Sequence, residues 1–270
     1  MTQQGTAAIT GASSGIGATY AQRLAQRGYD LLLIARDRQR LEQLAAKLAH
    51  DYGVSCQVLV ADLTRPEELA KVEQRLRDDA SISLLVNNAG MSVEGDFLDS
   101  DIERVQSMLT LNMLAPTRLA HAAGNAFRAR GAGTLINVAS VLALVHEQAN
   151  GAYNASKSFV LTLSRSLTQT LSPHGVQVQA VLPGITRTEI FDRAGQSLDN
   201  IPAQMIMEVE TLVDAALAGL DLGESVTIPS LERLENWQAF DAARGVLLPD
   251  LSLSQSASRY RNGGGNSSQQ

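Results

Sequence analysis

Strand-like and helix-like segments alternate along most of this chain, and the alternation limits its fold more than any other feature. Residues 31–35 are an uninterrupted apolar run of strand length, typical of a strand buried on both faces of a parallel sheet. Residues 38–52 follow with Leu41, Leu44 and Leu48 along one helical face. The same patterns predict strands at 6–10, 31–35, 57–61, 82–86, 134–139, 176–182 and 226–228, and helices at 16–27, 38–52, 66–77, 102–130, 153–171, 208–220 and 231–247. This order predicts an α/β protein with a doubly wound parallel sheet and helices on both of its faces.

The chain length fits one large domain, which we expect to cover residues 1–261. Its 270 residues, 44% of them hydrophobic, can bury a sizeable core without a disulfide or a metal. Residues 262–270 contain only Gly, Asn, Ser and Gln, which predicts a disordered polar tail. The regularity weakens after Pro183, and residues 186–207 fit either a mobile segment on the substrate side or an ordinary surface loop.

A glycine-rich segment joins the first expected strand to the first expected helix: Thr10-Gly11-Ala12-Ser13-Ser14-Gly15-Ile16-Gly17. Glycines at this junction let the backbone approach a phosphate closely. The start of the helix adds unpaired N–H groups and a partial positive charge. The segment therefore predicts a site for a dinucleotide pyrophosphate, with a chance glycine-rich turn as the alternative.

The end of the second expected strand bears on the choice of dinucleotide. An enzyme that uses NAD usually has an acidic residue near this point to bind the ribose 2′-hydroxyl, but Ala35 cannot do so. The guanidinium of Arg36 can pair with a 2′-phosphate, and Ser13 and Ser14 can add hydrogen bonds. We therefore expect NADP(H) in preference to NAD(H). The adjacent Asp37 is an argument against this choice, and a solvent-facing Arg36 is the alternative.

Tyr153 and Lys157 stand four residues apart in an expected helix, so both project from one face. A free tyrosine has a pKa near ~10, and a nearby ammonium or the positive nicotinamide of an oxidised cofactor would lower it. Tyr153 could then exchange a proton with a carbonyl or alcohol oxygen as a general acid or base. Taken alone, such a pair is usually part of an amphipathic surface.

Together, Gly-x3-Gly-x-Gly, Asn87-Asn88-Ala89-Gly90, Ser140, Tyr-x3-Lys and Pro183-Gly184 resemble the short-chain dehydrogenase/reductase family. The resemblance covers about residues 6–188 in the expected order, and it implies a single-domain Rossmann fold. It also implies that Ser140 binds the substrate oxygen and that Lys157 binds the nicotinamide ribose. Asn112 matches the asparagine that supports a water linking the lysine to solvent.

The resemblance thus implies a catalytic group of Asn112, Ser140, Tyr153 and Lys157. The cofactor-binding residues that the motifs and the resemblance indicate are Gly11, Ser13, Ser14, Gly15, Ile16, Gly17, Arg36, Asp62, Leu63, Asn88, Ala89, Gly90, Tyr153, Lys157, Pro183, Gly184, Ile185, Thr186 and Thr188. Several have ordinary structural alternatives: a helix cap for Asp62, a turn for Pro183-Gly184 and a local kink for Asn112.

Charge and composition argue against other classes of function. The net charge of −6, without a Lys/Arg cluster among aromatics, argues against nucleic acid as a partner. Apolar runs are too short for a membrane span, and the polar start leaves no room for a signal peptide, so we expect a cytoplasmic location and no membrane partner. Cys56, the single cysteine, is expected to be a small buried residue of a strand. The four histidines lack ligand spacing, so we expect no metal site.

We therefore expect an NADP(H)-dependent oxidoreductase that moves hydride between nicotinamide and a small-molecule carbonyl or secondary alcohol. A non-catalytic NADP(H)-sensing regulator on the same fold is the main alternative, and a sugar-nucleotide epimerase or dehydratase is a second. By resemblance, the segments 102–130 and 153–171 would pair copies into a homodimer or homotetramer. Apolar positions such as Phe159, Leu163 and Leu167 fit that pairing or the core of one chain.

Overall fold

The computed structural model describes residues 4–93, 95–145, 147, 150–189 and 201–261. Seven strands form one sheet in the order β3-β2-β1-β4-β5-β6-β7, and every neighbouring pair is parallel. The strands are β1 (Thr6–Thr10), β2 (Asp30–Ala35), β3 (Cys56–Val60), β4 (Ile82–Asn87), β5 (Gly133–Val138), β6 (Val176–Val181) and β7 (Val226–Thr227). The order reverses between β1 and β4, which is where a doubly wound sheet opens a crevice for ligands. The predicted fold is confirmed.

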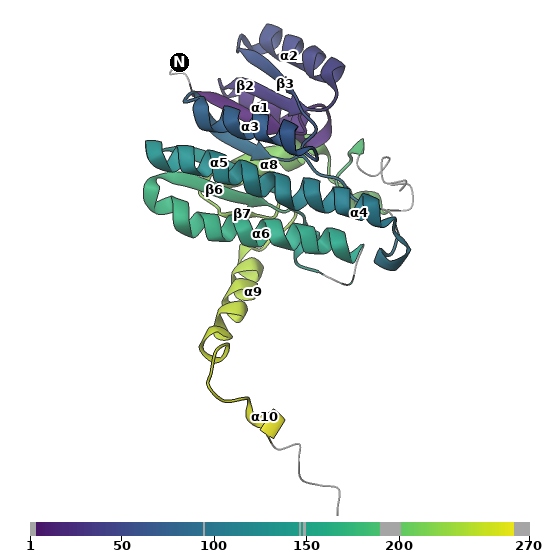
Figure 1. Cartoon of the computed structure of the whole chain (residues 1–270), viewed down its shortest axis with the longest axis vertical. Helices are drawn as coiled ribbons and strands as arrows, with labels where there is room; N and C mark the ends of the chain where they lie inside the picture. The colour runs from purple at the N-terminus through teal and green to yellow at the C-terminus, as the bar shows by residue number, and fades with distance from the viewer. Residues whose placement is uncertain (1–3, 94, 146, 148–149, 190–200, 262–270) are drawn as a thin grey trace, which may run out of the picture. The chain divides into compact units, whose positions relative to one another are not determined.

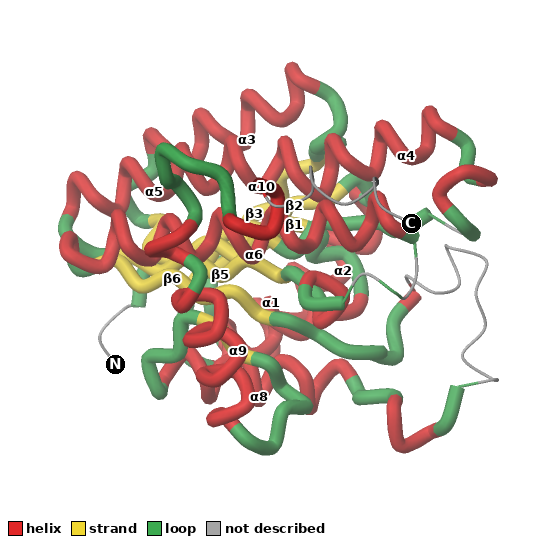
Figure 2. Tube along the Cα trace, turned by 90° about the horizontal axis from the view of Figure 1, so that it is seen from below, coloured by secondary structure: helices red, strands yellow, loops and turns green. Residues whose placement is uncertain are grey.

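Helices cover both faces of this sheet, as Figures 1 and 2 show. One face carries α1 (Gly15–Gln26), α2 (Arg38–Tyr52) and α8 (Val209–Asp221). The other face carries α3 (Pro66–Asp78), α5 (Ala115–Arg130) and α6 (Gly151–Leu171), with α4 (Ile102–Leu109) preceding α5. None of the helices in the described part of the chain is long and apolar enough to cross a membrane.

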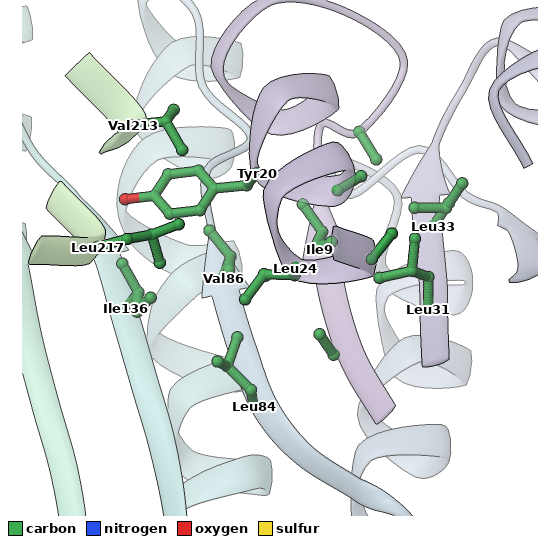
Figure 3. Packing of buried hydrophobic residues seen from close by; sticks show 14 of the residues in the cluster. Ile9, Tyr20, Leu24, Leu31, Leu33, Leu84, Val86, Ile136, Val213 and Leu217 are labelled. Carbon is green, nitrogen blue, oxygen red and sulfur yellow. The ribbon is translucent and has the colours of Figure 1, made fainter. Parts of the chain in front are cut away.

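Alternating strand residues supply the two cores. Ile9 and Leu33 point to the layer of α1 and α8, whereas Ala8, Leu32 and Ile34 point to the layer of α3 and α5. Because both sets are buried, residues 31–35 of β2 are apolar throughout, as in other parallel sheets with two covered faces. Figure 3 shows the first core, where strand residues such as Ile9, Val86 and Ile136 lie beside Tyr20 of α1 and Leu217 of α8.

The stretch predicted as one helix over 102–130 is not a single regular helix. α4 ends at Leu109, a π-helical turn covers Thr110–Leu114, and α5 begins at Ala115. The extra residue of this turn brings Asn112 inward, where its amide binds the backbone of Met91. The other predicted elements are present, with ends that differ by a few residues.

Cys56 differs from its expected environment. It is half-buried at the first residue of β3 rather than enclosed in the core. Burial still raises the pKa of its thiol to about 11, so the thiolate is scarce at neutral pH.

The described residues 231–261 belong to a second compact unit, distinct from the unit that ends at Ser230. Its described part holds α9 (Leu234–Val246), a short 3₁₀ turn at Leu248–Asp250 and α10 (Ser258–Arg261). No residue of α9 or α10 is buried, although Trp237 and Phe240 stack with ring centroids 5.6 Å apart. The extension of the Rossmann domain to residue 261 stays a prediction, and the expected tail at 262–270 lies outside the described residues.

Candidate active site

A cleft of about 2230 Å³ lies at the carboxyl ends of the strands. It is lined by every predicted site residue except two, namely Gly17 and Asn112, which lie behind the lining. Residues far apart in the sequence therefore meet along one continuous cavity. The glycine-rich segment borders the same space as Ser140, Tyr153 and Lys157.

The turn after β4 supports the glycine-rich segment through hydrogen bonds. The Asn88 side chain donates to the carbonyls of Thr10 at 3.0 Å and Gly11 at 3.4 Å, and the Thr10 hydroxyl accepts from the N–H groups of Asn88 and Ala89. A Cβ at Gly11 would come within 2.8 Å of the Asn88 amide nitrogen, and one at Gly17 would collide with the Gly11 carbonyl. These two glycines therefore permit close backbone packing, and Gly17 acts without touching the cleft.

Gly15 lines the cleft, and the space around it shows whether a nucleotide phosphate would fit. Its φ of +52° suits glycine, and an added Cβ would meet only the Thr188 side chain, at 3.4 Å. Ser14 is the N-cap of α1, and the first turn of this helix has no acidic residue. Open space in front of unhindered helix N–H groups is what a pyrophosphate requires, so the residues present fit a dinucleotide.

At the end of the cleft beside β2 and β3, Arg36 is exposed and Asp62 is half-buried. Burial alone would raise the pKa of Asp62, but hydrogen bonds from Thr64 and the charges of Arg36 and Arg65 outweigh it and lower that pKa. Asp37 caps α2 by accepting from the backbone N–H of Arg40 at 3.0 Å, and the Arg40 guanidinium lies 3.5 Å from it. The Asp37 carboxylate, whose charge would disfavour a 2′-phosphate, is therefore already hydrogen-bonded and paired with Arg40 of α2.

Tyr153 and Lys157 project from α6 into the cleft beside Ser140, which follows β5. The Lys157 ammonium lies 5.7 Å from the centre of the Tyr153 ring and donates to the Val138 carbonyl at 3.2 Å. The Ser140 hydroxyl accepts from the N–H of Leu142 at 3.2 Å and donates to the Pro183 carbonyl at 3.5 Å.

Burial dominates the electrostatics of this group. It raises the pKa of Tyr153 to about 12, against a smaller lowering by a hydrogen bond with Ser140. It also lowers the pKa of Lys157 to about 8. The pKa of Tyr153 is thus shifted opposite to the direction expected from its lysine neighbour, because loss of solvent outweighs the Ser140 hydrogen bond. A phenol that keeps its proton at neutral pH is suited to donate it.

Asn112 lies behind Lys157. Its amide accepts from the Met91 N–H at 3.0 Å and donates to the Met91 carbonyl at 2.9 Å and the Ser156 hydroxyl at 3.2 Å. A Cβ at Gly90 would lie 3.2 Å from the Asn112 oxygen and 3.5 Å from the Lys157 nitrogen. Gly90 therefore allows the asparagine and the lysine to approach each other, and the π-helical turn presents the asparagine.

The segment after β6 forms the opposite wall. Thr186 pairs with Met207 in an isolated parallel bridge, and Met207 N–H donates to the Ile185 carbonyl at 2.9 Å. Arg187 forms an exposed ion pair with Glu208 at 2.9 Å. The core of the expected substrate-side segment, 190–200 with Arg193, lies outside the described residues.

Sequence reasoning missed several residues of this cleft, among them Asn150, which is buried with only 4% of its surface exposed. It caps α6 three residues before Tyr153. An asparagine ahead of an apolar helical segment is a recognised N-cap signal and could have identified it.

A doubly wound sheet with a glycine-rich phosphate loop and a Tyr–Lys pair at its switch point defines a nucleotide-dependent oxidoreductase. The chain belongs to the short-chain dehydrogenase family, because the family model described as short chain dehydrogenase matches residues 5–199.

Solved structures and curated proteins agree with this assignment. A short-chain dehydrogenase from Sphingobium yanoikuyae in complex with NADPH is 51% identical, with a TM-score of 0.93 over 95% of this chain and 100% of that chain. A bulky-bulky ketone specific alcohol dehydrogenase from Comamonas testosteroni is 44% identical, with a TM-score of 0.89 over 96% of this chain and 99% of that chain. A very-long-chain 3-oxoacyl-CoA reductase from Anas platyrhynchos is 30% identical over 80% of this chain and 69% of its own.

Proposed function

We propose that this protein is an NADP(H)-dependent carbonyl reductase and alcohol dehydrogenase. The observation that carries the proposal is the single cleft in which Ser140, Tyr153 and Lys157 stand beside the glycine-rich phosphate loop. Nicotinamide, when bound, supplies or accepts the hydride. The protein then has to orient the substrate and manage one proton on its oxygen.

Tyr153 is the proposed acid and base. Its raised pKa keeps the phenol protonated at neutral pH, so it can donate to a carbonyl oxygen as negative charge develops there. The Ser140 hydroxyl, already aligned beside Tyr153, would bind the same oxygen. Lys157, whose pKa is about 8, supplies a positive charge near the phenol, and Asn112 orders the backbone behind it.

The preference for NADP(H) rests on charge at the adenosine end. Arg36 is exposed there, while the nearby Asp37 is engaged with Arg40. A guanidinium that faces a 2′-phosphate forms charge-assisted, often paired hydrogen bonds. The NADPH bound in the Sphingobium yanoikuyae relative supports the same choice.

For the substrate, we propose ketones with two bulky substituents. The cleft near Tyr153 carries apolar side chains from two loops and from the segment before α8, namely Met91, Val93, Val141, Leu142, Met205 and Ile206. Such a lining suits apolar groups on both sides of the carbonyl. The specificity named for the Comamonas testosteroni relative supports this class.

A turnover screen tests the proposal. Purified protein is mixed with NADPH or NADH and a panel of aldehydes, small ketones and diaryl or aryl–alkyl ketones, and loss of cofactor absorbance is followed. We expect NADPH-dependent reduction that is fastest with the bulky ketones. NADPH binding without oxidation by any carbonyl or alcohol pair would contradict the proposal and favour a nucleotide-sensing regulator.

A further inference from the structure

Three polar residues of α6 form a stripe next to the catalytic pair. Asn150, Asn154 and Ser158 are spaced four apart, so they share one face that adjoins Tyr153 and Lys157. We call these three residues the polar stripe. Each of them donates a hydrogen bond to the backbone of a loop beside the substrate end of the cleft.

Asn150, the first residue of the polar stripe, anchors the loop after β4 through hydrogen bonds. Its amide nitrogen donates to the Gly95 carbonyl at 3.1 Å and to the Ser100 hydroxyl at 3.0 Å. Its oxygen accepts from the Ala152 N–H at 3.0 Å and caps α6. One buried side chain therefore links the start of the catalytic helix to both ends of the turn at 95–100.

The other two residues fasten the loop after β5. The Asn154 amide donates to the Val145 carbonyl at 3.2 Å, and the Ser158 hydroxyl donates to the Ala143 carbonyl at 2.9 Å. This loop begins at Ser140 and contributes Val141 and Leu142 to the cleft. The two substrate-side walls are thus both attached to the helix that presents Tyr153.

We propose that the polar stripe, with Asn150 as its principal member, is a positioning device that sets the spacing between Tyr153 and the two loops. The inference rests on the proposed function, because the space between these loops is where the carbonyl substrate would lie. Asn150 is a positioning residue in this account: it acts on substrate through the 95–100 turn, and its hydrogen bonds decide which substituents the cleft accepts.

Two substitutions separate this role from helix capping. Asn150→Asp and Asn150→Ser each keep an oxygen that caps a helix well, but neither can donate to both Gly95 and Ser100. The serine variant is neutral, so an effect shared by both variants does not come from added charge. Ser100→Ala removes the acceptor of one of the two Asn150 hydrogen bonds. This variant tests the proposal if an Asn150 variant folds poorly. Asp101→Asn, at the cap of α4, is the matched control.

The measurements are steady-state kinetics with ketones of increasing size, NADPH titration, and hydrogen exchange of the peptide spanning 92–101. The Asn150 hydrogen bonds lost in both variants are together worth about a factor of ten in affinity. We therefore expect a roughly tenfold higher KM for the ketone in both Asn150 variants. We expect unchanged NADPH affinity, faster exchange at 92–101, a smaller effect of the same kind in Ser100→Ala, and wild-type behaviour of Asp101→Asn.

Wild-type ketone KM and wild-type exchange in both Asn150 variants would overturn the proposal. An equal loss of ketone turnover, NADPH affinity and thermal stability would also overturn it, because that pattern indicates only a structural role. Failure of the proposed function looks different: the unmodified protein would turn over no carbonyl. In that case hydrogen exchange at 92–101 still decides whether Asn150 fastens the loop.

Discussion

At the scale of single residues, the cleft combines a protonated phenol with a lysine whose charge is easily lost. Both shifts have the same cause, because burial favours the neutral form of each group. In the proposed mechanism, carbonyl reduction requires the proton of Tyr153 and gains from the charge of Lys157. Alcohol oxidation requires the phenolate, which the protein's own groups disfavour. In the isolated protein, the protonation states of Tyr153 and Lys157 therefore favour carbonyl reduction over alcohol oxidation.

We expect kcat/KM for ketone reduction to fall as the pH rises through about 8, since Lys157 loses its proton there. The pKa of Tyr153, about 12, is too high to produce this decline. The test is a pH–rate profile from neutral to alkaline solution for the wild type and for Lys157→Arg, whose guanidinium keeps its charge. In an active Lys157→Arg variant the decline should move to higher pH. A profile that stays flat well above pH 8 would show that the lysine charge is not needed.

Arg36 is expected to set the cofactor preference. Arg36→Ala removes a charge-assisted contact with a 2′-phosphate worth roughly 1.5–3 kcal/mol, so the preference for NADPH over NADH should fall about tenfold or more. Arg38→Ala is the matched control, because Arg38 is paired with Glu42 and does not line the cleft. Titration of both cofactors measures the ratio. An unchanged ratio in Arg36→Ala would place recognition of the phosphate elsewhere.

At the scale of elements, helix α1 begins at the glycine-rich segment and also contributes Tyr20 to the core. The Tyr20 hydroxyl is buried between α1 and α8, and it has no hydrogen-bond partner among the described residues. Figure 3 shows the ring directed toward Val213 and Leu217. Burial raises the pKa of this phenol. A polar atom buried in this way costs stability.

Tyr20→Phe should therefore stabilise the protein. Removal of an unpaired buried hydroxyl is worth about 1 kcal/mol, which corresponds to a Tm increase of about 2–4 °C for a domain of this size. Chemical and thermal unfolding measure the effect, and NADPH affinity should not change because Tyr20 is remote from the cleft lining. A lower Tm would mean that the hydroxyl has a partner that the described contacts do not include.

The elements differ in how far the sequence could predict them. Strands such as residues 31–35 follow from uninterrupted apolar runs, and the phosphate loop follows from glycines at a strand–helix junction. A local kink at Asn112 was one interpretation of the sequence, but the π-helical turn itself could not be predicted, because the Asn112 amide is held by the backbone of Met91, which is distant in sequence. The role of Asn150 was missed for the same reason, since its partners Gly95 and Ser100 are brought near only by the fold.

At the scale of the whole molecule, the parallel sheet gathers the ends of its strands into one cleft, which is why motifs spread over residues 10–188 meet. Family motifs predicted the glycine-rich segment and the Ser140, Tyr153 and Lys157 group of this lining, whereas the apolar substrate wall depends on loop geometry. Phe159 and Leu163 of α6 are only half-buried, so this chain does not fully cover them. That exposure supports the proposed pairing of copies through this helix.

We expect light scattering at micromolar concentration to give the mass of a dimer or tetramer. Leu163→Glu places a charge on the half-buried face and should shift the population to monomer. Ser166→Glu, at an exposed position of the same helix, is the control. A monomeric wild type would contradict the proposed assembly without affecting the proposed chemistry.

The central claim is that Tyr153 transfers the proton, and Tyr153→Phe tests it most directly. The substitution keeps the ring and its packing but removes the reacting oxygen, while Tyr260→Phe makes the same change at an exposed position. We predict that Tyr153→Phe binds NADPH as the wild type does and reduces its best ketone about 10²–10⁴-fold more slowly, whereas Tyr260→Phe is unaffected. A Tyr153→Phe protein that reduces the ketone at nearly the wild-type rate would contradict the account.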